Sequence, residues 1–158
     1  MKVLLLGTCM QGRAALHDLA ASPVVSEITA ADREIVALEQ YVAARGFGER
    51  VRCRHVDAAH PKALDHLVAE GFDVVVDLLP AALMGRVAAA AVRHGAHLVN
   101  TMYVSPEVRA LADAAVARGV TILPEFGMDP GIDLVLLGEA VRGFEEVTDV
   151  LSYGSGIP

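Results

Sequence analysis

Near its start the chain reads Val3-Leu4-Leu5-Leu6-Gly7-Thr8-Cys9-Met10-Gln11-Gly12-Arg13, an apolar run that meets a glycine-bounded segment. An apolar run without alternation is typical of a strand buried on both faces, as parallel sheets require. The Ala- and Leu-containing segment Gln11–Ala21 follows and predicts a helix. The chain is therefore predicted to open with a strand, a tight turn and a helix.

The same rhythm repeats along the chain. Further apolar runs predict strands at Glu27–Ala31, Val51–Val56, Asp73–Leu79, His97–Thr101 and Val120–Pro124. The amphipathic segments between them predict helices at Arg33–Arg45, Pro61–Glu70, Ala81–His94 and Pro106–Arg118, with one more at Pro130–Gly143. Strands that alternate with helices need right-handed crossovers over the sheet faces. We therefore expect an α/β fold, a doubly wound parallel Rossmann sheet of strand order 3-2-1-4-5-6 with helices on both faces.

Composition narrows the kinds of partner. The chain has 158 residues, 54% of them hydrophobic and 21% charged, which fits one globular domain. Its net charge is −7 and its basic residues are scattered, so a nucleic-acid partner is not expected. Asp77, Arg86 and Arg93 interrupt the longest apolar stretches, and Val3–Leu6 is too short for a signal peptide, so we expect no membrane segment and a cytoplasmic location.

Only two cysteines are present, Cys9 and Cys53. The expected topology places them at the end of the first strand and on the third, two interstrand spacings of ~4.8 Å apart, which is beyond the reach of a disulfide. We expect two free thiols. The six histidines do not cluster with Cys or Glu at ligand spacing, so no metal site is predicted.

The glycine turn has the spacing of a dinucleotide-binding fingerprint, with Cys9 in place of its second glycine. That spacing is equally typical of a plain strand-to-helix turn. Asp32 closes the second strand at 32 − 7 = 25 positions after Gly7, where a carboxylate accepts hydrogen bonds from the adenosine ribose. Asp32 would also serve as N-cap of the helix Arg33–Arg45. Together these features predict NAD(P) binding by Gly7, Thr8, Cys9, Met10, Gln11, Gly12, Asp32 and Arg33.

Other candidate cofactor contacts follow later strands. Asp57 is placed to reach the adenine amino group or to cap a helix, and Pro80 to line the nicotinamide ribose or to open a helix. Leu79 and Thr101 lie at the ends of the fourth and fifth predicted strands. The Asp32 carboxylate favours NAD because it repels the 2′-phosphate of NADP, a repulsion that Arg33 can offset.

Four segments carry a family resemblance. Thr101–Glu107 is similar to a T-x-Y-V-S-P-E stretch, Glu125–Asp133 to E-x-G-x-D-P-G-I-D, Asp73–Pro80 to D-V-V-x-x-L-L-P and Ser152–Pro158 to S-Y-x-G-G-L-P. All four resemble the saccharopine dehydrogenase and lysine 6-dehydrogenase family along essentially the whole chain. Leu134 departs from the His that often follows the second motif, and Cys9 departs from the fingerprint.

The resemblance implies an oxidoreductase that transfers a hydride between the CH–NH group of an amino-acid substrate and NAD(P). It implies catalytic roles for Glu125, Asp129 and Tyr103. Asp129 and Pro130 open a helix whose free amides are expected to orient the nicotinamide carboxamide or a substrate carboxylate, although Asp129 also suits a helix cap.

Residues 1–143 are expected to form the NAD(P)-binding Rossmann domain, and 144–158 to begin a substrate domain whose remainder lies beyond Pro158. That domain would hold most substrate contacts and a homodimer interface, so the 158-residue chain is expected to be inactive. Two alternatives stay open. One is reductive coupling like that of carboxynorspermidine or homospermidine synthases, and the other is a dinucleotide-sensing module without turnover.

Overall fold

A computed structural model describes residues 1–153 of the chain. Its sheet has six strands, all parallel, in the order β3-β2-β1-β4-β5-β6. The predicted strand order is confirmed. The strands are β1 (Lys2–Leu6), β2 (Glu27–Asp32), β3 (Val51–His55), β4 (Val74–Asp77), β5 (His97–Asn100) and β6 (Ile122–Leu123).

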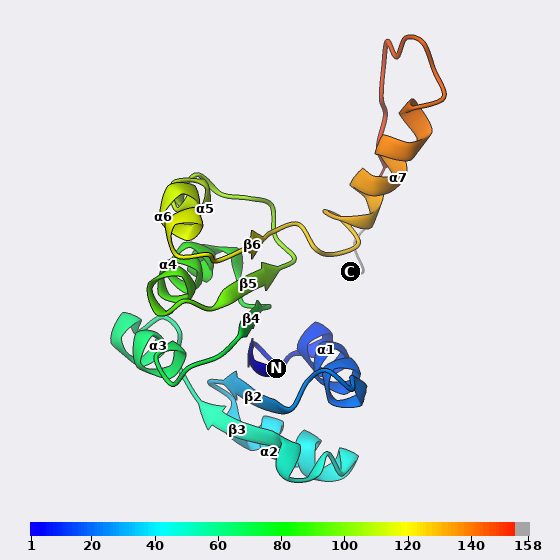
Figure 1. Ribbon diagram of the computed structural model, residues 1–158. Coiled ribbons are helices and arrows are strands. Elements are labelled where there is room, and N and C mark those ends of the chain that lie inside the picture. The colour runs from blue at the N-terminus through cyan, green and yellow to red at the C-terminus, as the bar shows by residue number, and fades with distance from the viewer. Residues whose placement is uncertain (154–158) are drawn as a thin grey trace.

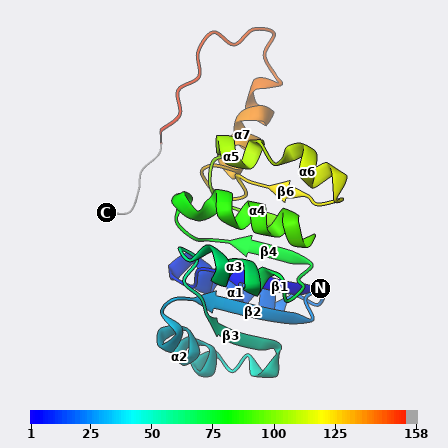
Figure 2. The ribbon, with the colours of Figure 1, turned by 90° about the vertical axis from the view of Figure 1, so that its left-hand side faces the viewer.

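Helices cover both faces of this sheet (Figures 1 and 2). On one face lie α1 (Met10–Ala21) and α2 (Ile35–Arg45), and on the other lie α3 (Pro61–Val68) and α4 (Met84–His94). The short helices α5 (Pro106–Arg109) and α6 (Ala112–Ala117) lie beside α4. Two 3₁₀ turns, η1 (Gly48–Arg50) and η2 (Ala81–Leu83), precede β3 and α4, and α7 (Ile132–Val141) follows β6.

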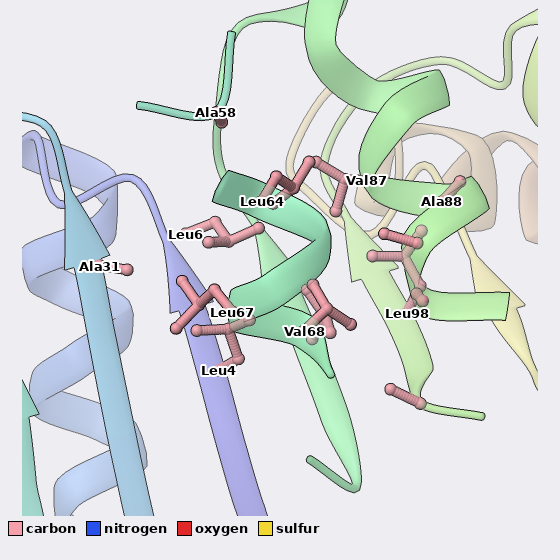
Figure 3. Close-up of a cluster of buried hydrophobic side chains, with 14 of the residues drawn as sticks. Leu4, Leu6, Ala31, Ala58, Leu64, Leu67, Val68, Val87, Ala88 and Leu98 are labelled. Atoms are coloured by element: carbon pink, nitrogen blue, oxygen red, sulfur yellow. The ribbon is translucent and has the colours of Figure 1, made fainter. Parts of the chain in front are cut away.

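The central strand shows why its apolar run has no alternation. Leu4 and Leu6 pack on one side in a cluster that includes Leu64 of α3 and Val87 of α4 (Figure 3). Val3 and Leu5 of the same strand face the opposite cluster, against α1 and α2. Each fully buried leucine contributes roughly 1.5–3 kcal/mol by leaving water. The doubly covered sheet therefore follows from the opening residues of the chain.

The segment predicted as one helix, Pro106–Arg118, is instead two helices. The amide of Leu111 donates to the Val108 carbonyl at 3.1 Å, an i→i−3 bond that tightens the chain between α5 and α6. The Leu111 side chain packs against two apolar clusters, and this packing stabilises the turn. Similarly, the predicted helix Ala81–His94 begins as the 3₁₀ turn η2 before continuing as α4.

The C-terminal part of the described chain departs from the sheet. Helix α7 projects away from it in both views (Figures 1 and 2) and begins at Ile132, two residues after the predicted start. The strand predicted at Val147–Tyr153 is wrong, because these residues adopt no regular structure and no strand among residues 1–153 pairs with them. The motif at Ser152–Pro158 falls largely on residues 154–158, which lie outside the described residues.

Candidate dinucleotide-binding site

The turn after β1 is built around two glycines in close contact. Gly7 adopts φ +85°, and a Cβ there would lie 2.9 Å from the Leu78 carbonyl oxygen. A Cβ on Gly12 would lie 2.0 Å from the Gly7 carbonyl oxygen. The Gly7 amide donates to the Ala31 carbonyl at 3.0 Å, which ties the turn to β2. Helix α1 therefore meets β1 so closely that no side chain fits between them.

Cys9 replaces the second fingerprint glycine without backbone strain. It is the N-cap of α1, with φ −67° and ψ −160°, an extended conformation open to any residue. Its side chain is exposed and lines the cleft beside the turn. Cys9 and the half-buried Cys53 are both free, which confirms the prediction of two thiols. The Cys9 side chain therefore narrows the cleft and does not disturb the backbone of the turn.

Asp32 is held in place by the turn that precedes α1. Its Oδ2 accepts hydrogen bonds from the Thr8 amide at 2.6 Å and from the Thr8 hydroxyl at 2.8 Å, and its Oδ1 accepts from the Glu34 amide at 3.0 Å. Burial opposes ionisation, but the hydrogen bonds from Glu34 and Thr8 outweigh it and hold the pKa of Asp32 below its ordinary value. Asp32 is thus a fixed carboxylate.

The alternative role of Asp32 as N-cap of α2 is wrong. The helix begins at Ile35, with Glu34 as its N-cap residue, two positions later than predicted. The bond from Asp32 to Glu34 spans the chain just before the helix, as an aspartate side chain does in a turn.

A cleft of about 280 Å³ lies between this carboxylate and the loops after β3 and β4. Most of the predicted cofactor residues line it: Gly7, Thr8, Cys9, Asp32, Arg33, Asp57, Leu79 and Pro80. The cleft has further lining residues that were not predicted from the sequence: Val56, Ala58, Ala59, Leu78 and Leu83. Val56 and Leu78 directly follow the last residues of β3 and β4, and Ala58 and Ala59 lie in the loop after β3, a position in the chain that could have identified them. The cleft lies at the sheet edge where such folds bind ligands.

The remaining predicted cofactor residues lie outside the lining of this cleft. Met10 and Gln11 are exposed on the first turn of α1, and Gly12 is buried against β1. Thr101 lies beside Gly127, where an added Cβ would come within 3.3 Å of its side chain. Asp129 and Pro130 belong to the loop before α7.

Two alternatives for the loop residues are corrected by their contacts. Asp57 Oδ1 accepts from the Ala59 amide at 2.9 Å, whereas the N-cap residue of α3 is His60. Asp57 therefore shapes the turn and does not cap the helix. Pro80 is the N-cap residue of the 3₁₀ turn η2, not the first residue of a helix, and its carbonyl accepts from the Leu83 amide at 2.9 Å.

The three predicted catalytic residues come from the loops after β5 and β6. The Tyr103 hydroxyl donates to Asp129 Oδ1 at 2.8 Å. This hydrogen bond, followed by burial and the charges of Asp129, Asp133 and Glu125, raises the pKa of Tyr103 above its ordinary value. Glu125 Oε1 accepts from the Val104 amide at 3.1 Å. The loops are tied together by side chains that carry the predicted chemistry.

The first amides of α7 are not free to hold a ligand, contrary to the prediction. Gly131 donates to Asp133 Oδ1 at 2.7 Å, Ile132 to the Gly127 carbonyl at 3.0 Å and Asp133 to the Met128 carbonyl at 3.1 Å. Gly131 is the N-cap residue, so Asp129 does not cap the helix either. Asp129 instead accepts a hydrogen bond from the Tyr103 hydroxyl through Oδ1.

Among residues 1–153, no group of three or more His, Cys, Asp or Glu side chains is arranged to hold a metal ion. Within the same range, no helix is long and apolar enough to cross a bilayer.

The parallel sheet, the glycine turn at the start of α1 and the fixed carboxylate at the end of β2 define a dinucleotide-binding domain of the Rossmann class. Residues 3–123 match a family model described as the saccharopine dehydrogenase NADP binding domain. The chain belongs to the saccharopine dehydrogenase family and contains its dinucleotide-binding domain.

Curated relatives extend the similarity over nearly the whole chain. The NADP-dependent, L-glutamate-forming saccharopine dehydrogenase of Saccharomyces cerevisiae is 30% identical over 160 residues, covering 99% of this chain and 34% of that protein. The corresponding enzyme of Pyricularia oryzae is 32% identical over 163 residues, with the same coverage of 99% and 34%.

A solved structure of the family also resembles this chain in fold. Saccharopine dehydrogenase from Saccharomyces cerevisiae, without ligand, superposes with a TM-score of 0.78 at 29% identity, covering 90% of this chain and 31% of that one. The chain spans about a third of the length of the relatives it matches.

Proposed function

We propose that this chain binds a nicotinamide dinucleotide with its adenosine in the 280 Å³ cleft and its pyrophosphate on the turn before α1. The observation that carries the proposal is the Asp32 carboxylate, fixed by Thr8 beside the Gly7–Gly12 turn. A carboxylate at this place accepts hydrogen bonds from the ribose hydroxyls. The amides at the start of the 12-residue helix α1 favour the negative pyrophosphate.

We propose further that the preferred cofactor is NAD, although the family model and the fungal relatives are named for NADP. A phosphate placed ~4 Å from the ionised Asp32 would be repelled by about 1–4 kcal/mol, a roughly fivefold to thousandfold preference for NAD. Arg33 is exposed and only 3.8 Å from Glu34, so a 2′-phosphate would have to compete with that carboxylate for the guanidinium. Repulsion of the 2′-phosphate by the fixed Asp32 carboxylate should therefore exceed its attraction to the exposed Arg33 guanidinium.

The proposed reaction is hydride transfer between the CH–NH group of an amino acid, or the imine derived from it, and the dinucleotide. The bound nicotinamide would supply the redox chemistry. The amine must be uncharged to lose a hydride, so a proton acceptor must lie within hydrogen-bond reach. We propose Glu125 and Asp129 as the carboxylates for this role, supported by the hydrogen bonds that hold them beside the loop after β5. Tyr103, whose pKa is raised, would stay a proton donor at neutral pH.

We assign residues 1–143 to the dinucleotide domain and 144–158 to the start of a substrate domain. Helix α7 supports this division because it exposes apolar side chains around its axis: Ile132, Leu134, Val135, Leu136 and Leu137. A contiguous apolar surface of this sort on a globular protein is typical of an interaction site. We propose that the further domain supplies the amino-acid contacts and a homodimer interface, in a cytoplasmic enzyme.

Titration calorimetry of the 158-residue chain with NAD and with NADP tests the cofactor proposal. We expect saturable binding, with a lower Kd for NAD, and a smaller difference between the two cofactors in Asp32→Asn. Failure to bind either cofactor would overturn the proposed function, whereas equal or tighter NADP binding would overturn only the preference for NAD. A longer family protein that binds NAD but reduces none with amino acids would instead be a sensing module.

A further inference from the structure

We infer that Thr8 is a positioning residue that sets the choice between NAD and NADP by holding the carboxylate of Asp32. The inference rests on the proposed function and adds a determinant of selectivity that touches the cofactor only through another residue. It starts from the convergence of two donors of one residue, the Thr8 amide and hydroxyl, on a single oxygen of Asp32.

The geometry leaves Asp32 little freedom. One carboxylate oxygen is held at 2.6 Å and 2.8 Å by Thr8, and the other at 3.0 Å by the Glu34 amide. Hydrogen bonds on both oxygens fix the plane of the group as well as its direction. Thr8 is only 6% exposed, so water has little access to compete for its hydroxyl. Asp32 itself is half-buried and lines the cleft.

The hydroxyl is the part of this arrangement that depends on the side chain at position 8. The backbone amide would donate whatever non-proline residue stood there, but the second donor is the side-chain hydroxyl, which Ser shares and Val and Ala lack. A hydrogen bond to a charged group is worth about twice a neutral one. Because Thr8 lies in the turn between Gly7 and Cys9, it also locks Asp32 to the segment that would receive the pyrophosphate.

A locked carboxylate discriminates between the cofactors in two ways. Toward NAD it presents an acceptor in a fixed direction, so the ribose 2′-hydroxyl finds its partner without a loss of side-chain entropy. Toward NADP it presents a charge that cannot rotate away from the 2′-phosphate. Without the hydroxyl, Oδ2 keeps only the Thr8 amide as a donor, so the carboxylate is held less rigidly and its charge is less well stabilised. Selectivity then falls, while the pyrophosphate amides and the Gly7–Gly12 turn still bind either dinucleotide.

The test measures Kd for NADH and NADPH in wild type, Thr8→Val and Thr8→Ser, by fluorescence titration at a pH above 7. We expect Thr8→Val to lower the ratio Kd(NADPH)/Kd(NADH) by about fivefold to tenfold. Thr8→Ser should keep the ratio within about twofold of wild type, because serine restores the donor. Thr29→Val is the matched control, since Thr29 is a buried threonine of the same strand as Asp32 that lies outside the cleft.

A cycle with Asp32→Asn separates positioning from a general effect on the fold. In the Asp32→Asn background, Thr8→Val should leave the ratio unchanged, because there is no charge left to position. An unchanged ratio in Thr8→Val, or equal weakening of both cofactors, would overturn the inference. Failure of wild type to bind either cofactor would instead refute the proposed function. If Thr8→Val loses its far-UV circular dichroism, Thr8→Ala removes the same hydroxyl and the same outcomes decide.

Discussion

Asp77 and Asn100 lie side by side at the same register position of β4 and β5, with 2% and 1% of their surfaces exposed. Asp77 Oδ1 accepts from the Leu79 amide at 3.1 Å, and Asn100 Oδ1 accepts from the Met102 amide at 3.1 Å. Each side chain thereby shapes the loop that follows its own strand. One loop carries Leu79 and the other carries Tyr103, so this buried pair supports both halves of the candidate site.

Asp77→Asn is expected to stabilise the protein at neutral pH. Burial raises the pKa of Asp77 to about 6 from 3.8, so the folded state holds its proton more tightly than the unfolded state does. Stability from this group is present below the unfolded pKa and is lost as pH rises through the folded one. The loss corresponds to about 3 kcal/mol between roughly pH 4 and pH 6. Urea unfolding across this range should show a flatter pH profile in Asp77→Asn, and an unchanged profile would contradict the assignment.

Asp65→Asn provides a control of opposite sign. Hydrogen bonds from His94 and Arg93 lower the pKa of Asp65, so its contribution is present above the unfolded pKa and is lost as pH falls. This variant should be less stable than wild type at neutral pH and should approach it under acid conditions. The same direction of change in both variants would show that the pH profile does not report these two carboxyls.

Gly12→Ala is expected to destabilise the fold and to weaken dinucleotide binding. The added Cβ would lie 2.0 Å from the Gly7 carbonyl oxygen, so α1 must move away from β1. Overpacking of this kind costs roughly 1–3 kcal/mol, and more where backbone is the obstacle. Gly138→Ala is the matched control, because a Cβ at Gly138 in α7 meets nothing within 4 Å. Thermal unfolding should separate the two, and equal melting temperatures would contradict the close contact of α1 with β1.

Cys9→Gly is expected to tighten NAD binding modestly. Cys9 is exposed in the cleft, at the position where the fingerprint has a glycine and the pyrophosphate approaches the backbone. Its removal relieves crowding without altering a strained conformation, because Cys9 already has an ordinary extended backbone. Calorimetric titration of both proteins measures the difference. Weaker binding by the glycine variant would mean that Cys9 packs productively against the cofactor.

Strand order was predictable because each buried parallel strand is an apolar run without alternation, as β1 shows. Contacts between residues far apart in the sequence were not predictable in this way. The bonds from Thr8 to Asp32 link residues 24 positions apart, and they depend on the register of β1 against β2. Both residues were predicted as cofactor contacts, but the hydrogen bonds between them were not predicted.

Near the end of the described chain, local composition predicted a strand that does not form. Val147–Tyr153 has the composition of a strand, but a strand also needs a neighbour for its backbone hydrogen bonds, and none lies beside it among residues 1–153. Likewise the amides before α7 looked free, yet Asp133, two residues on from Gly131, occupies one of them. Local pattern predicted where elements form, and the surrounding chain decided which groups remained available.

We expect the 158-residue chain to bind NAD and yet to catalyse no hydride transfer. The sheet and the loops at its edge line the proposed adenosine cleft, so we expect dinucleotide binding without a further domain. The proposed catalytic groups are more open to solvent. Tyr103 is 61% exposed, and Phe126, which follows Glu125, is 64% exposed. An amino acid placed beside them would remain accessible to water.

Hydride transfer needs donor and acceptor held at about 3–3.5 Å in line, and orientation of this kind supplies roughly 7–11 kcal/mol of the barrier reduction. An open site forfeits much of that, so the residual rate should be undetectable. The assay supplies NAD⁺ and follows the appearance of NADH absorbance with saccharopine, lysine and other amino acids. The Saccharomyces cerevisiae saccharopine dehydrogenase with saccharopine and NADP⁺ is the positive control. Turnover by this chain would mean that Tyr103, Glu125 and Asp129 already form a complete active site, without a further domain to enclose the substrate.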